Sequence, residues 1–105
     1  MPQFAVYLNA NPATRMSIPY LLDVQSDLIA ELSTRVVVPL HTAEVMKDKV
    51  LKTLMPVFEV EGTPVVMLTP QLAGVSRKVL GKQVADLSAM RNEIIAALDL
   101  LITGI

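Results

Sequence analysis

The chain has 105 residues, of which 52% are hydrophobic and 18% are charged, and its formal net charge is −1. This length fits a single domain over residues 1–105, and the composition is too apolar for a disordered chain. The charge balance disfavours nucleic-acid binding as the main activity, and the lack of cysteine excludes disulfides, zinc–thiolate sites and thiol nucleophiles.

The first part of the chain predicts three strands. Residues 4–8 alternate in the manner of a strand, and a polar loop is expected to follow over 9–17. A second strand is expected over 20–25. Residues 35–40 are β-branched and apolar on both faces, which predicts a buried strand whose end Pro39 places at an edge or a bulge.

The middle of the chain is less regular. Residues 41–54 carry many charges, and a short helical turn is expected after Thr42 as its N-cap. Three apolar runs then predict strands, of which the first two form a hairpin around a short glycine-containing turn: 55–60, 64–69 and 75–80. The last of these strands is expected to end at Gly81.

The end of the chain predicts an amphipathic helix. Asp86 or Ser88 is a suitable N-cap, and Gly104 stands where a C-cap glycine is expected. Apolar residues recur at spacings of three and four and form one stripe: Leu87, Met90, Ile94, Leu98 and Leu101. Together the elements predict an α+β fold, in which a mostly antiparallel sheet is followed by one packed helix.

Motifs for catalysis, metal binding or cofactor binding are not found in the sequence. His41 is the single histidine and no Gly-x-Ser-x-Gly turn accompanies it, so we predict no catalytic residue, no metal site and no cofactor. Apolar runs of bilayer-spanning length and a signal peptide are also missing, and the lack of cysteine suits a reducing compartment. We therefore expect a cytoplasmic protein that does not contact a membrane.

Two groups of charged residues have structural interpretations. Asp23 and Asp27 suit a turn after a strand, in which Asp27 or Ser26 bonds to local backbone. Arg77-Lys78 with Lys82 suits either an anion-binding patch or an edge strand protected by its charge.

The last turns of the predicted helix have uncompensated negative charge. A helix C-terminus carries partial negative charge, yet these turns add Asp99 and contain no Lys or Arg, and the apolar Ile105 stands at the end. Two interpretations remain open. Either Ile105 packs back on the core, or the helix face and its end form a binding epitope that a basic partner would complement.

Six segments that cover nearly the whole chain resemble, in the same order, the CcdB family of toxins: Gln3-Phe4-Ala5-Val6-Tyr7, Asp23-Val24-Gln25-Ser26-Asp27-Leu28, Val38-Pro39-Leu40, Asp48-Lys49-Val50, Val84-Ala85-Asp86-Leu87-Ser88 and Gly104-Ile105. The second and fifth of these are the most specific. The resemblance implies a homodimer of small barrel-like β-folds, each with a C-terminal helix, related to the MazF and Kid toxins. A high apolar content agrees with a surface that a partner subunit covers.

The same resemblance implies a function. CcdB-like toxins are not enzymes; they bind the A subunits of DNA gyrase and trap that enzyme with cleaved DNA. A CcdA-like antitoxin neutralises the toxin, and the pair represses its own operon, so the toxin meets DNA only indirectly, through the antitoxin or gyrase. The gyrase-binding residues, by matched position, lie on the helix end and on an adjoining loop: Leu28, Ile29, Asp99, Ile102, Thr103, Gly104 and Ile105.

Two alternatives stand beside gyrase poisoning. Thr103 occupies the position of a Trp in the best-known members, and Asp99 that of a neutral amide, which suits a degenerate homologue that binds antitoxin but not gyrase. The other alternative is a MazF-like endoribonuclease, which needs a general base and a cation placed over an RNA groove. Arg35, His41 and Arg77 are the cationic candidates for that role.

Overall fold

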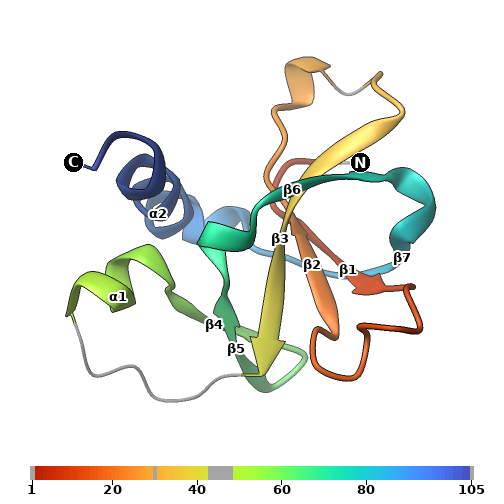
Figure 1. The fold of residues 1–105 in the computed structure, drawn as a ribbon, viewed down its shortest axis with the longest axis horizontal. Helices are drawn as coiled ribbons and strands as arrows, with labels where there is room; N and C mark the ends of the chain where they lie inside the picture. The colour runs from red at the N-terminus through yellow and green to blue at the C-terminus, as the bar shows by residue number, and fades with distance from the viewer. Residues whose placement is uncertain (1, 30, 43–48, 105) are drawn as a thin grey trace.

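The computed structural model describes residues 2–29, 31–42 and 49–104. Within them, seven strands form one antiparallel sheet: β1 (Ala5–Asn9), β2 (Tyr20–Asp23), β3 (Thr34–Thr42), β4 (Val57–Val60), β5 (Thr63–Met67), β6 (Ala73–Ser76) and β7 (Leu80–Asp86). The helical elements of the same residues are α1 (Lys49–Leu54), α2 (Arg91–Thr103) and the short 3-10 turns η1 (Asp27–Ile29), η2 (Thr69–Gln71), η3 (Arg77–Val79) and η4 (Ser88–Met90). The predicted α+β fold is confirmed, because the sheet curls into a half-barrel and the C-terminal helix packs beside it (Figure 1).

The curl of the sheet follows from the way β3 shares its two edges. The strand order is β4-β5-β3-β2-β1-β7, and β6 also pairs with β3. One edge of β3 pairs with β2, while the other edge pairs with β6 over 34–37 and with β5 over 40–42. Because β6 pairs with β3 and β7 pairs with β1, the connection through η3 takes the chain from one side of β2 to the other (Figure 1).

Pro39 lies at the point where β3 changes partners. It pairs with Leu21 of β2, and its carbonyl accepts a bond at 3.0 Å from the N–H of Leu68, just beyond the β5 pairing. The missing N–H of Pro39 faces the same side, between the β5 and β6 ladders, where the sheet requires no donor. The strand therefore continues past Pro39 to Thr42, two residues beyond the predicted range.

The main core lies between one face of the sheet and α2. Cross-strand neighbours on this face are fully buried: Val6, Leu22 and Val38. Ile94 and Ala97 of α2 pack against them, also without exposed surface. The predicted apolar stripe is correct at Ile94, but the second contact is Ala97, while Leu98 is only partly buried. A small side chain at this point allows the helix backbone to lie close to the sheet.

The two ends of the C-terminal helical segment have different caps. Asp86 Oδ1 accepts a 2.7 Å bond from the N–H of Ser88, but the N-cap of η4 is Leu87, without a side-chain cap, so the predicted N-cap at Asp86 or Ser88 is wrong. The α-helix proper begins only at Arg91, without a side-chain cap. Gly104 has the left-handed φ of 74°, and its N–H donates to the carbonyl of Leu100 at 3.1 Å, so the predicted C-cap is confirmed.

The predicted hairpin is confirmed as β4 and β5. Val60 pairs with Thr63, and the two residues between them, Glu61 and Gly62, have φ values of 52° and 79°. A two-residue turn with both φ values positive matches the right-handed twist of the flanking strands. The helical turn expected after Thr42 falls largely on residues 43–48, which lie outside the described residues.

The strand predicted over 75–80 is wrong. β6 ends at Ser76, whose Oγ accepts a 3.3 Å bond from the N–H of Lys78 and begins η3. A new strand, β7, then runs through Gly81 to Asp86. The predicted range contains strand residues at both of its ends, but a turn capped by the Ser76 hydroxyl divides it. Gly81 lies inside β7 instead of ending a strand.

Candidate partner-binding site

The end of α2 presents an apolar side chain beside negative charge. Ile102 is 74% exposed, and Asp99 and Thr103 are exposed on the same turns. Thr103 Oγ1 donates to the carbonyl of Asp99 at 2.7 Å. The last turn carries no basic side chain, so the partial negative charge of the helix end is not offset there. Gly104 caps the helix and is exposed, whereas Ile105 lies outside the described residues.

A second apolar surface belongs to the η1 loop, residues 24–33, which joins β2 to β3. Leu28 is 95% exposed and Ile29 is 51% exposed, although both are large hydrophobic residues. A hollow of about 290 Å³ is lined by the tip of this loop: Asp27, Leu28, Ile29, Glu31 and Leu32. Apolar side chains grouped on a surface in this way are typical of a binding site.

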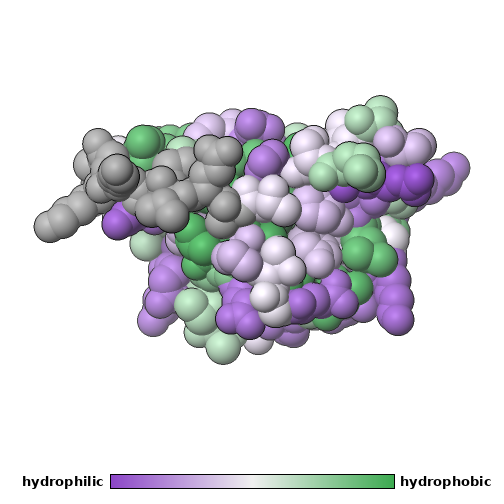
Figure 2. Space-filling view, turned by 90° about the horizontal axis from the view of Figure 1, so that it is seen from below, coloured by the Kyte–Doolittle hydropathy of each residue, from purple (hydrophilic) through white to green (hydrophobic). Residues whose placement is uncertain are grey.

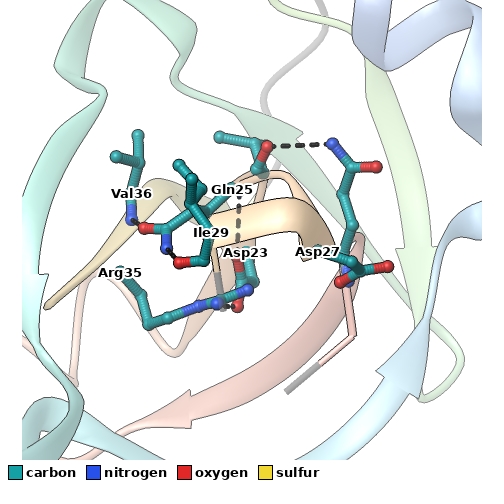
Figure 3. Close-up of polar contacts among 8 residues, drawn as sticks. Asp23, Gln25, Asp27, Ile29, Arg35 and Val36 are labelled. Atoms are coloured by element: carbon teal, nitrogen blue, oxygen red, sulfur yellow. Dashed lines mark hydrogen bonds and ion pairs between the residues drawn. The ribbon is translucent and has the colours of Figure 1, made fainter. Parts of the chain in front are cut away.

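A buried ion pair anchors the base of the η1 loop. Arg35 Nε lies 2.7 Å from Asp23 Oδ2, and both side chains are fully buried (Figure 3). The other carboxylate oxygen, Asp23 Oδ1, accepts a 3.0 Å bond from the N–H of Gln25. Burial raises the pKa of Tyr7, with the nearby Asp23 carboxylate adding to the rise and Arg35 opposing it, so the phenol stays neutral beside the pair.

Further hydrogen bonds hold the rest of the loop. The N–H of Gln3 donates to Asp27 Oδ1 at 2.8 Å, and its side-chain amide donates to the carbonyl of Val24 at 3.2 Å. Ser26 Oγ accepts a 3.1 Å bond from the N–H of Leu28. The predicted local bond of Ser26 is therefore confirmed, but Asp27 binds the distant N-terminal segment instead of its own turn.

The Asp23–Arg35 pair is not predicted from the sequence, in which Asp23 suits a turn and Arg35 is a candidate cation. The pair depends on the register between β2 and β3, which local patterns do not contain. A signal was present, since a charged residue at the boundary of an apolar strand is rarely buried without a partner. Two such residues of opposite charge, one on each of two consecutive predicted strands, indicate an ion pair.

The residues considered for RNA cleavage are not grouped. Arg35 is fully buried against Asp23. His41 is partly buried, and its ring Nδ1 lies 2.8 Å from the carbonyl of Thr42. Arg35 and His41 are roughly 20 Å apart along β3 at the usual rise per strand residue. Arg77 is exposed on η3 and lies at the same end of β3 as Arg35, since its N–H donates to the carbonyl of Ser33 at 3.3 Å. His41 therefore lies far from the two arginines, of which Arg35 is held in a buried ion pair.

The described part of the chain lacks two further features, a group of metal ligands and a membrane-spanning helix. No three acidic or histidine side chains there are grouped so that they could hold a metal ion. None of the described helices has the length and hydrophobicity needed to cross a bilayer. On the side seen from below, hydrophobic surface occurs in separate patches between hydrophilic ones (Figure 2).

The structure does not bring all the candidate residues together within one chain. The end of α2, with Asp99, Ile102 and Thr103, lies at one side of the molecule (Figure 1). The η1 loop, with Leu28 and Ile29, lies apart from it, at the end of the sheet where β3 begins (Figure 1). The candidate site therefore consists of two separate exposed surfaces on one half-barrel.

The structure is therefore a small half-barrel that presents two exposed apolar surfaces. The family model described as CcdB protein matches residues 3–104. The chain therefore belongs to the CcdB family, whose members are toxins of toxin–antitoxin systems. The resemblance noted in the sequence is confirmed over nearly the whole chain.

Proposed function

We propose that this toxin binds the A subunit of DNA gyrase and traps the enzyme on cleaved DNA, without catalytic activity of its own. The observation that carries the proposal is the exposed apolar end of α2, where Ile102 is 74% exposed beside Asp99 and the negative helix terminus. Free energy is gained when a partner covers such a side chain, and a basic rim on that partner would offset the helix charge.

The η1 loop supplies the second contact of the proposed interface. Leu28 and Ile29 are held outward by polar contacts at the base of the loop, so they offer apolar surface in a fixed conformation. Binding to a preorganised surface avoids the entropy cost of ordering it. Together with Asp99, Ile102, Thr103, Gly104 and Ile105, these two residues make up the proposed gyrase-binding set.

We further propose that the toxin acts as a homodimer. The two surfaces lie apart in one chain, and the A subunits of gyrase are themselves paired, so two copies related by a two-fold axis would present a symmetric epitope to a symmetric target. A CcdA-like antitoxin would neutralise the dimer and form the repressor of the operon with it. On this proposal the toxin meets DNA only through antitoxin or gyrase.

Thr103 determines how strong this toxin is expected to be. Best-known members of the family carry Trp at the matched position, and large aromatic residues are enriched among the side chains that dominate interface energies. Ile102 remains as an apolar anchor, but it has less surface to bury than a Trp. We therefore expect poisoning to need a higher toxin concentration than in members that end in Trp-Gly-Ile.

The test is a gyrase cleavage assay with purified full-length toxin. Ile102→Ser should abolish the accumulation of cleaved DNA while leaving the melting temperature unchanged, because the side chain is exposed. Val57→Ser is the matched control, since Val57 is also an exposed apolar residue, 48% exposed, but lies on β4. Equal activity of the Ile102 variant and the control would refute the site.

Expression in cells separates the alternatives. Killing of cells with normal gyrase, together with survival of cells that carry a resistant A subunit, supports gyrase poisoning. Killing of both strains indicates another target, such as RNA. Survival of both strains, with antitoxin binding retained in vitro, identifies a degenerate homologue.

A further inference from the structure

Gln25 is a buried polar residue whose one side chain joins two separate segments of backbone. It is 4% exposed. Its Nε2 donates to the carbonyl of Ile29 at 2.7 Å, and its Oε1 accepts a bond from the N–H of Val36 at 3.0 Å (Figure 3). Both ends of the amide are therefore used, one toward the η1 loop and one toward β3.

The position of this amide extends the sheet where a strand leaves it. The β2–β3 pairing ends at Asp23 and Val37, and one more ladder bond follows, from the N–H of Val24 to the carbonyl of Val36 at 3.0 Å. The N–H of Val36 then meets the Gln25 side chain in place of a strand carbonyl. At the other end, Gln25 satisfies the carbonyl of Ile29, which ends η1 and so lacks a helical partner.

The conformation of the exposed tip depends on such polar contacts more than on apolar packing. Leu28 buries almost none of its side chain, so burial of that side chain contributes little to holding the tip in place. The tip is held instead by the bonds from Gln25 to Ile29 and from Leu28 to Ser26, together with the backbone bond from Ile29 to Ser26 at 3.2 Å and the bond from Gln3 to Asp27. Of the three side chains that make these bonds, those of Gln25, Ser26 and Asp27, the one that also bonds to a strand of the sheet is Gln25, at Val36.

We infer that Gln25 is a positioning residue for target binding, which holds Leu28 and Ile29 in their binding conformation without touching the target. This inference rests on the proposed function, in which those two residues contact the gyrase A subunit. Removing the side-chain amide would free the tip to move in the unbound toxin, and binding would then have to order it. We expect affinity for the A subunit to fall about tenfold, through a loss of preorganisation.

The experiment measures binding of the full-length toxin to the purified gyrase A subunit by isothermal titration calorimetry. Gln25→Met keeps the length of the side chain and removes both hydrogen bonds. Val60→Ala, at a buried position of β4, is a control for general destabilisation. Amide hydrogen exchange at Leu28 and Ile29 is measured on all variants. We expect faster exchange at these two amides and about tenfold weaker binding in Gln25→Met, with neither effect in Val60→Ala.

A double-mutant cycle separates positioning from other effects. In a background of Leu28→Ala with Ile29→Ala, the Gln25→Met change should have little further effect on affinity, because the residues through which it acts are gone. An additive tenfold loss in that background would overturn the inference. The inference is also overturned if Gln25→Met binds and exchanges like the wild type while the variant with Leu28→Ala and Ile29→Ala binds weakly. That result would leave the proposed function intact. If the wild-type chain does not bind the A subunit, the proposed function fails; unaltered amide exchange at Leu28 and Ile29 in Gln25→Met would then refute the positioning role separately.

Discussion

The buried Asp23–Arg35 pair provides the most demanding test of the structure. Replacing Arg35 with Met removes the cation of the pair. The Asp23 carboxylate stays fully buried and keeps the hydrogen bond from the N–H of Gln25. Breaking a buried ion pair from one side costs about 3–5 kcal/mol. Because one hydrogen bond to the carboxylate survives, we expect a value at the lower end, about 3 kcal/mol.

This loss would be large for a domain of this size. Small domains are stable by only about 5–15 kcal/mol, and each kcal/mol shifts the melting temperature of such a domain by roughly 4–8 °C. We therefore expect Arg35→Met to melt about 12–24 °C below the wild type. Urea unfolding followed by far-UV circular dichroism measures the free energy directly. All variants must be compared at one protein concentration, because a dimer gains stability with concentration.

The double variant Asp23→Leu with Arg35→Met decides whether the physical reason is correct. Replacing both members of a buried pair by apolar residues is often near neutral, so the double variant should recover much of the stability that the single variant loses. Full recovery is not expected, since the N–H of Gln25 then loses its acceptor. A loss below about 1 kcal/mol in Arg35→Met, or a double variant no more stable than the single one, would refute the reasoning.

Two further predictions concern β7 and the start of η4. A Cβ at Gly81 would lie 2.9 Å from the carbonyl oxygen of Leu8, so Gly81→Ala should lower the free energy of unfolding by about 1–3 kcal/mol, while Gly74→Ala, with open space around it, should change it little. Equal urea midpoints for the two would contradict this. Hydrogen bonds from Ser88 lower the pKa of Asp86 in the folded protein below its usual 3.8. The ionised carboxylate therefore adds stability above pH 3.8, and this stability is lost as the pH falls through the lower pKa of the folded state. Asp86→Asn should therefore be less stable than the wild type at about pH 6, and the difference should shrink toward about pH 2; a pH-independent difference would count against it.

The exposed state of Leu28 and Ile29 shows how far sequence patterns reach. Periodicity placed these residues after a strand and did not distinguish them from core residues. Their role came from the resemblance to the family, and it remains a proposal. Their exposure follows from the contacts of Gln25 and Asp23 with β3, and those contacts depend on the register between β2 and β3.

The division of residues 75–80 shows a different limit. An apolar run of this length satisfies the pattern of one strand, and local propensity did not indicate that Ser76 would cap a turn. The turn exists because β6 pairs with β3 whereas β7 pairs with β1, and the chain must cross from one to the other. Pairing partners lie far away in the sequence, so a local pattern does not contain them.

The sequence by itself determined the elements whose causes are local. The turn that contains Gly62 and the C-cap at Gly104 both follow from a left-handed φ that glycine adopts without strain, whereas the positive φ of Glu61 was not predicted. The apolar stripe around Ile94 follows from the helical period. Only the tertiary structure decided which charges are buried and which apolar residues are exposed, because both depend on strand register. A shift of one residue in that register would move each side chain to the opposite face.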